Sequence, residues 1–150
     1  MNTAVKTDNI SKTYPGVLAN SNVSITINAS SIHAVVGENG AGKSTLMKIL
    51  YGMIKPDSGN IEIFNNAASI SSPKEAINLG IGMVHQHFML AKNLTVLENI
   101  ILGIDRASLK NLGLSKYKKQ IQEVMKTYSL DIDLNMFVDE LSVGEKQRVE

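Results

Sequence analysis

Nine consecutive residues decide the fold of this chain, and they read Gly37-Glu38-Asn39-Gly40-Ala41-Gly42-Lys43-Ser44-Thr45. They fit the pattern G-x-x-x-x-G-K-[ST], in which a glycine-rich backbone encloses an anion. Gly37 allows a tight turn, and neither Gly40 nor Gly42 has a side chain that would keep the backbone away from a phosphate. The backbone amides from Gly40 to Thr45 can therefore converge on a β-phosphate.

The residues on either side of these nine support the same interpretation. Ser31–Val36 is a short β-rich run that predicts a strand entering the loop. After the loop, a helical stripe of apolar residues predicts a helix whose positive N-terminal end faces the anion. Lys43 adds a charge for the β- and γ-phosphates, and the Ser44 hydroxyl can bind Mg²⁺. The apolar stripe consists of Leu46, Ile49, Leu50 and Met53.

Composition excludes several classes of protein. The chain has 150 residues, enough for one domain or part of a larger one, and 43% of them are hydrophobic. Cysteine is absent, which excludes disulfide bonds and thiolate metal sites. The net charge of +1 argues neither for nor against nucleic acid. Neither a signal peptide nor an apolar run of about 20 residues, the length of a membrane span, is present.

The first forty residues predict antiparallel β-structure. A strand is expected over residues 3–13, and Pro15-Gly16 is a turn signal that holds Tyr14 beside it. Apolar residues then alternate with polar ones over residues 23–28, as in a half-buried strand.

The middle of the chain predicts an α/β arrangement. Ile61–Phe64 alternates as a strand, and residues 65–68 read as a loop. Ser72-Pro73-Lys74-Glu75 is a capping box that opens a short helix ending at Gly80. Ile81–Val84 is a continuous apolar run, which predicts a buried central strand.

The rest of the chain predicts mainly helix. Capping boxes at Thr95–Glu98 and at Ser142–Glu145 each open a helix, and the second helix still runs at Glu150. Between them lie a polar loop at Lys110–Ser115 and an amphipathic helix. The apolar face of that helix consists of Tyr117, Ile121, Val124, Met125 and Tyr128, and its opposite, solvated face of Lys116, Lys118, Lys119, Glu123 and Lys126.

A phosphate loop of this kind also needs an acidic residue at the end of a buried strand to hold Mg²⁺. Two segments end in acids, one at Asp105 and one at Asp139-Glu140. The capping box at Thr95–Glu98 favours a helix over the segment that ends at Asp105. In the segment that ends at Asp139-Glu140, the apolar run is only three residues long. The remaining explanation places the aspartate beyond residue 150.

Four motifs in order resemble the nucleotide-binding domain of ABC transporters, over essentially the whole chain. They are Tyr14, the loop Gly37–Thr45, Val84-His85-Gln86-His87-Phe88, and Leu141-Ser142-Val143-Gly144-Glu145-Lys146-Gln147-Arg148. The resemblance implies that Tyr14 stacks on adenine and that Gln86, in the Q-loop, reaches toward Mg²⁺ and the attacking water. It also implies that Ser142 and Gly144, in the signature, contact ATP held by a second domain.

The resemblance implies an α/β P-loop NTPase core with an antiparallel β subdomain and a helical subdomain, incomplete after the signature. The β subdomain is expected over about residues 1–30 and 60–70, and the P-loop core over residues 31–59 and 71–86. The helical subdomain, with the signature, is expected over residues 87–150.

The resemblance also implies a mechanism and partners. ATP and Mg²⁺ are expected ligands, and two domains close head to tail around two nucleotides. Permease subunits in the membrane and, indirectly, an extracytoplasmic substrate-binding protein are expected partners, with no nucleic acid. The protein is then expected at the cytoplasmic face of the membrane, as the ATPase of an importer.

Departures from the usual signature narrow the resemblance further. Val143 stands in place of a usual glycine, and Glu145 in place of a frequent glutamine. This form is similar to importers of simple sugars and nucleosides. The runs Gly82–Leu90 and Asn93–Ile100 are similar to the nucleoside branch.

Three interpretations are consistent with the sequence. The first is an importer ATPase. The second is a soluble ABC-type ATPase without a membrane partner, although the compact interval from Gln86 to Ser142 is typical of transporters. The third is a fragment that only binds nucleotide, because the family places its Mg²⁺ aspartate, catalytic glutamate and switch histidine after the signature. None of His33, His85 and His87 stands at the switch position.

Overall fold

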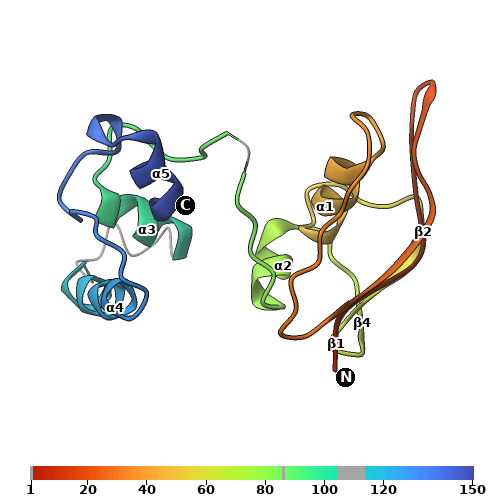
Figure 1. Cartoon of the computed structure of the whole chain (residues 1–150), viewed down its shortest axis with the longest axis horizontal. Coiled ribbons are helices and arrows are strands. Elements are labelled where there is room, and N and C mark those ends of the chain that lie inside the picture. Colours follow the sequence, from red (N-terminus) through yellow and green to blue (C-terminus); the bar gives the residue numbers. More distant parts are fainter. Residues whose placement is uncertain (1, 86, 105–113) are drawn as a thin grey trace. The chain divides into compact units, whose positions relative to one another are not determined.

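The computed structural model describes residues 2–85, 87–104 and 114–150. The chain forms two compact units, residues 1–83 and 84–150 (Figure 1). Each unit has an apolar core of its own.

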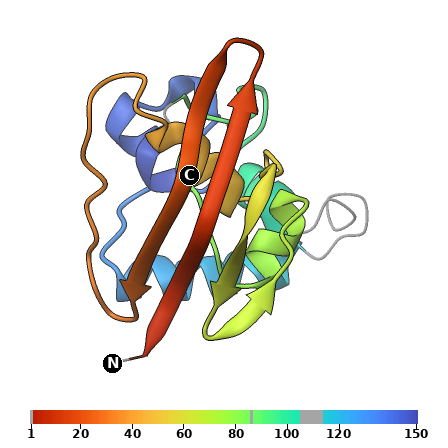
Figure 2. The ribbon, with the colours of Figure 1, turned by 90° about the vertical axis from the view of Figure 1, so that its right-hand side faces the viewer.

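The first unit is built on an antiparallel sheet of four strands in the order β2-β1-β3-β4. The strands are β1 (Thr3–Tyr14), β2 (Val17–Asn28), β3 (Ser58–Ile63) and β4 (Asn66–Ala68). Figure 2 shows the long β1–β2 hairpin, with the shorter β3 beside β1 and β4 beside β3 at the edge of the sheet. The hairpin turns at Pro15-Gly16, where Tyr14 pairs with Val17, and this confirms the predicted antiparallel start of the chain.

Two helices belong to this unit, α1 (Lys43–Leu50) and α2 (Pro73–Asn78). Three of the four predicted stripe residues are buried, while Met53, beyond the end of α1, is 46% exposed. The predicted cap of α2 forms in part. The Ser72 hydroxyl accepts from the Glu75 amide at 3.3 Å, but the Glu75 carboxylate accepts from Ser71 and not from the Ser72 amide. The core consists of Ile10, Leu46, Ile49, Leu50, Ile61, Ile63, Ile70 and Ala76.

Two predicted strands are not formed. Residues 31–36 form no strand, and Ile32 is 103% and Val36 89% exposed. Residues 81–84 are also irregular, and Val84 is 67% exposed. A central strand needs neighbours that take its backbone hydrogen bonds and cover both of its faces. Among the described residues neither segment has such a neighbour, so the predictions of an entering strand and of a buried central strand are wrong for this structure.

One strand was missed, because residues 66–68 read as a loop but form β4. Ile63 pairs with Asn66 across a two-residue turn. The turn residues Phe64 and Asn65 have φ of 48° and 63°. Positive φ at both central residues is the geometry that matches the twist of a tight hairpin.

The second unit is helical, with α3 (Val96–Ile104), α4 (Leu114–Thr127), the 3-10 turn η1 (Val138–Glu140) and α5 (Val143–Val149). All three helices were predicted, but the apolar face of α4 is narrower than expected. Val124 is 52% exposed, and Tyr128 lies beyond the helix and is 72% exposed. The core consists of Val96, Ile101, Ile121, Ile132, Leu134, Val138 and Leu141.

The acidic alternative at Asp139-Glu140 does not lie at the end of a strand. Asp139 and Glu140 are exposed on η1. Asp105 lies outside the described residues, as do Gln86 and residues 110–113 of the predicted polar loop. In the described part of the chain, no group of three or more His, Asp or Glu side chains could hold a metal ion. No helix in that part is both long and apolar enough to cross a membrane.

Candidate functional site: a phosphate loop and a capped signature helix

The loop before α1 has the backbone geometry of an anion cradle. Gly40 and Gly42 adopt left-handed conformations, with φ of 88° and 85°. Glu38 and Ala41 close a turn by a backbone hydrogen bond of 3.2 Å. Gly42 is the N-cap of α1, and no side chain caps this end of the helix in the structure. The first amides of α1 thus lack helical partners, and the helix dipole adds positive potential at the same place.

Lys43 lies across its own loop. Its Nζ donates to the carbonyl oxygens of Gly37 at 2.7 Å and of Glu38 at 2.8 Å. Ser44, the next residue, is exposed on the first turn of α1. The ammonium group and the free amides therefore belong to one short segment, as binding of a polyphosphate requires.

Tyr14 ends β1 and is half-buried beside a cationic side chain. Lys12 Nζ lies 5.9 Å from the centre of the Tyr14 ring, within the range of a cation–π contact. Asp57 fixes that lysine through an ion pair of 2.6 Å and also accepts from the Thr13 amide at 2.7 Å. The Lys12 hydrogen bond, followed by that of Thr13, holds the pKa of Asp57 below its ordinary value. The aromatic residue thus sits on an anchored strand end.

Ser142 and Gly144 lie at the start of α5, where the predicted capping box is complete. The Ser142 hydroxyl donates to the Glu145 carboxylate at 2.6 Å and accepts from the Glu145 amide at 3.3 Å. The carboxylate also accepts from the Ser142 amide at 2.8 Å. These bonds, that of the hydroxyl foremost, hold the pKa of Glu145 below its ordinary value. Both Ser142 and Gly144 are exposed.

The segment after Gln86 is held by two other elements of the second unit. The Asn99 side chain on α3 accepts from the Ala91 amide at 2.7 Å and donates to the carbonyls of Ala91 and Thr95, both at 3.0 Å. From the end of α5, the Glu150 carboxylate accepts from the Met89 amide at 2.9 Å. Residues 89–95 are therefore fixed by side-chain contacts from α3 and from the end of α5.

The predicted site residues fall into both units. Tyr14 and Gly37–Thr45 belong to the first, and Ser142 and Gly144 to the second. Two buried polar residues were missed, Asn20 beside the loop and Asn99 beside residues 89–95. Asn99 could have been found as a polar side chain directly before the apolar residues Ile100–Leu102 of α3. Asn20 carries no such signal.

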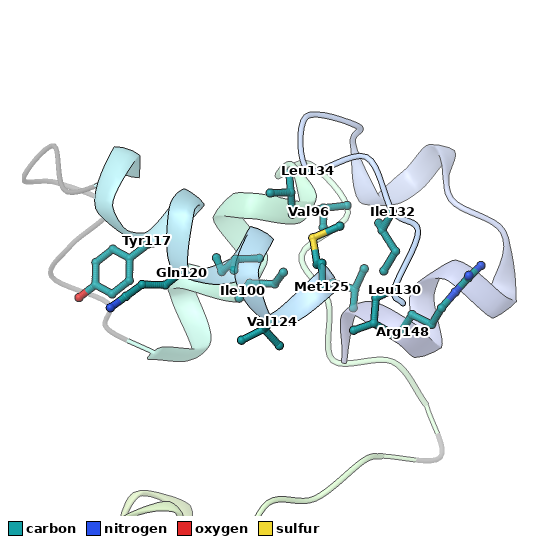
Figure 3. Close-up of a pocket in the computed structure, with 12 residues that line it drawn as sticks. Val96, Ile100, Tyr117, Gln120, Val124, Met125, Leu130, Ile132, Leu134 and Arg148 are labelled. Atoms are coloured by element: carbon teal, nitrogen blue, oxygen red, sulfur yellow. The ribbon is translucent and has the colours of Figure 1, made fainter. Parts of the chain in front are cut away.

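A cavity of about 300 Å³ lies in the second unit, and none of the predicted site residues lines it (Figure 3). It lies among α3, α4 and α5, and apolar side chains surround most of it. This cavity is therefore separate from the residues expected to bind nucleotide. Its walls consist of Val96, Ile100, Tyr117, Gln120, Ile121, Val124, Met125, Leu130, Ile132, Leu134, Arg148 and Val149.

Solved structures with the same fold are ATP-binding cassettes. A nucleotide-free ATP-binding cassette from an ABC transporter matches with a TM-score of 0.81 and 26% identity, over 98% of this chain and 62% of that one. The dimeric structure of a bacterial ABC transporter cassette matches with a TM-score of 0.76 and 31% identity, over 97% of this chain and 66% of that one. The fold and the loop together define a P-loop nucleotide-binding domain of the α/β class.

The chain belongs to the ABC transporter family, whose model matches residues 20–150. Among curated proteins, the nucleoside import ATP-binding protein NupA of Lactococcus lactis is 44% identical over 99% of this chain and 29% of its own length. The guanosine import ATP-binding protein NupO of Bacillus subtilis is 43% identical over 95% of this chain and 28% of its own length. The glucose import ATP-binding protein TsgD13 of Haloferax volcanii is 41% identical over 97% and 32%. The chain thus spans about three tenths of the length of these relatives.

Proposed function

We propose that this chain is the ATP-binding part of an ABC importer and that Gly37–Thr45 holds the phosphates of ATP. The observation that carries the proposal is the loop itself. Its left-handed Gly40 and Gly42, the uncapped start of α1 and the Lys43 ammonium group occupy one segment. In the proposal, Asn39 and Ala41 complete the loop, Thr45 adds an amide, and Tyr14 stacks on the adenine.

The second part of the proposal is a composite site. Ser142 and Gly144 contact ATP held by a second nucleotide-binding domain, arranged head to tail with the first. Two observations support this part: both residues are exposed at the start of a helix, and one of the similar cassettes is dimeric. ATP between two such domains would hold them together, and its hydrolysis would release them.

Magnesium fits the described residues only in part. Mg²⁺ prefers oxygen ligands and is held in such sites by one or two carboxylates, by waters and by the phosphates of the substrate. Ser44 supplies an exposed hydroxyl next to the loop, while the described residues hold no acidic cluster. In the proposal Ser44 and Gln86 are the ligands from this chain, and the ion neutralises phosphate charge. Lys43 and the loop amides orient the phosphates, and Gln86 positions the attacking water.

ATP hydrolysis belongs, in this proposal, to the protein as a whole. We infer that these 150 residues bind nucleotide without turning it over by themselves, because the described residues hold no acidic cluster that could complete a magnesium site. An ATPase assay of the 150-residue chain beside the protein that contains it tests this point. Turnover by the shorter chain alone would contradict it.

The partners are proposed from the names of the relatives. Proteins described as nucleoside, guanosine and glucose import ATP-binding proteins share 41–44% of their aligned residues with this chain. We infer that its protein works at the cytoplasmic face of a membrane, with permease subunits and, through them, an extracytoplasmic substrate-binding protein. The transported molecule is then a nucleoside or a simple sugar, and nucleic acid is not a partner.

Two experiments test the importer assignment. Affinity purification of the whole protein from membranes should recover permease subunits, whereas recovery without any membrane protein would favour a soluble ATPase. In the same protein, Ser142→Arg should stop ATP-driven dimerisation while ATP still binds to each domain. Unimpaired dimerisation of that variant would contradict the composite site.

A further inference from the structure

Asn20 is a buried polar residue of β2 that contacts the phosphate loop. Its side chain is only 6% exposed. Its Nδ2 donates to the carbonyl oxygen of Gly42 at 3.3 Å. The same oxygen accepts the Leu46 amide at 3.0 Å, the first hydrogen bond of α1. The Gly42 carbonyl is thus held by the sheet and by the helix at once.

The close approach of β2 to the loop depends on glycine at position 42. A Cβ on Gly42 would overlap the carbonyl oxygen of Ala19 and lie 2.8 Å from Asn20 Nδ2. The φ of 85° is also a conformation that residues with side chains rarely adopt. Gly42 of the loop therefore packs directly against the backbone of β2 at Ala19, and the side-chain amide of Asn20 donates the hydrogen bond between them.

This contact determines where the next amide points. A peptide group is planar and trans, so its carbonyl and its N–H point in opposite directions. Because Asn20 holds the Gly42 carbonyl toward β2, the Lys43 N–H must point away from β2. That N–H is one of the amides at the start of α1 that lack a helical partner. Asn20 therefore orients a donor of the phosphate cradle.

The remaining atom of the Asn20 amide argues against a role in stability. Its Oδ1 is buried, and no described residue donates a hydrogen bond to it. A buried acceptor without a partner destabilises the folded state, whereas an apolar side chain of similar shape would not. Leucine at position 20 would thus suit the sheet at least as well as asparagine, but it could not hold the Gly42 carbonyl.

We propose that Asn20 is a positioning residue for the phosphate loop, which raises the affinity for a nucleoside triphosphate by orienting the Gly42–Lys43 peptide. This inference rests on the proposed function of the loop. The contact is a single neutral hydrogen bond, so its loss should weaken ATP binding about fivefold. The stability of the nucleotide-free protein should not fall with it.

The experiment compares Asn20→Leu and Asn20→Asp with the native protein, and uses Thr26→Leu, an exposed position of the same strand, as the control for a new leucine. ATP is titrated into each protein, and thermal unfolding is followed without nucleotide. Asn20→Leu should unfold at the native temperature or above and bind ATP about fivefold more weakly. Asn20→Asp should bind more weakly still, because it places a carboxylate against the Gly42 carbonyl.

A second measurement uses no nucleotide. The ¹⁵N resonance of Lys43 reports the hydrogen bonding of the Gly42 carbonyl, so Asn20→Leu should move it and Thr26→Leu should not. Native ATP affinity in Asn20→Leu, an unmoved Lys43 resonance, or a lost affinity explained by a lower unfolding temperature would each overturn the inference. If the native protein does not bind ATP, the proposed function fails, and the Lys43 resonance still decides whether Asn20 orients the loop.

Discussion

The hydroxyl of Ser142 lies 2.6 Å from the carboxylate of Glu145, so the serine of the signature motif is engaged in its own helix cap. The reciprocal bond from the Glu145 amide, at 3.3 Å, completes the box. Contact between Ser142 and a nucleotide therefore has to share or replace the hydroxyl's bond to Glu145. The state of that carboxylate should affect both the helix end and its ligand.

A pH dependence follows from this pair. The pKa of Glu145 is lowered from 4.5 in the folded chain, so its contribution to stability is full above 4.5 and is lost as the pH falls through the lower, folded value. The amides of Ser142 and Glu145 should therefore lose protection against exchange in acid, when each rate is compared with the intrinsic rate at the same pH. The variant Glu145→Gln keeps a hydrogen-bond acceptor but does not titrate. In this variant, the loss of the α5 cap with falling pH should therefore not occur. An identical acid profile in both proteins would show that Glu145 does not hold this helix end.

Tyr14 gives a prediction about the base. If the ring stacks on adenine, Tyr14→Ala should weaken ATP binding by about 1–2 kcal/mol, while Tyr14→Phe should bind almost as the native protein does. Isothermal titration with ATP measures both. The ring lies beside the Lys12 ammonium group, 5.9 Å away, and the alanine variant leaves that lysine paired with Asp57. Equal affinity of the alanine and phenylalanine variants would mean that the ring does not contact the base.

Asn99 gives a prediction about stability in the second unit. Asn99→Ala removes the partner of the Ala91 amide and leaves a part-buried donor unsatisfied. The free energy of unfolding should fall by about 1–3 kcal/mol, as measured with urea. Asn93→Ala, at an exposed position of the same loop, is the matched control and should change it little. Two variants of equal stability would show that the Asn99 contacts do not hold residues 89–95.

The predictions from sequence succeeded where the signal was local. The hydroxyls of Ser72, Thr95 and Ser142 each accept from the amide three positions further on, and all three residues begin helices in the structure. The turn within Gly37–Thr45 and the helix that follows it were likewise predicted from local spacing. In these cases, neighbouring residues alone determine the conformation.

The two strand predictions that failed concern structure that depends on distant residues. The apolar runs at 31–36 and 81–84 have strand composition, but a strand also needs a hydrogen-bonded neighbour, and the described residues provide none. Asn20 escaped notice for a related reason. If apolar and polar residues alternated regularly back from Val23, Asn20 would lie on the opposite face of the sheet. A register shift between the pairs Ile10–Val23 and Lys12–Asn20 instead turns the Asn20 side chain inward. A bulge of this kind reverses the alternation and leaves no clear mark in the sequence.

The most direct test of the phosphate loop is ATP titration of the native protein, Lys43→Ala and Lys48→Ala. Lys48 is an exposed lysine on the same helix, so it controls for the loss of one positive charge. A charge-assisted contact to phosphate is worth about 1.5–3 kcal/mol, so Lys43→Ala should lose at least about tenfold in affinity. Lys48→Ala should bind as the native protein does. Equal ATP affinity in all three proteins would contradict the assignment of Gly37–Thr45 as the phosphate site.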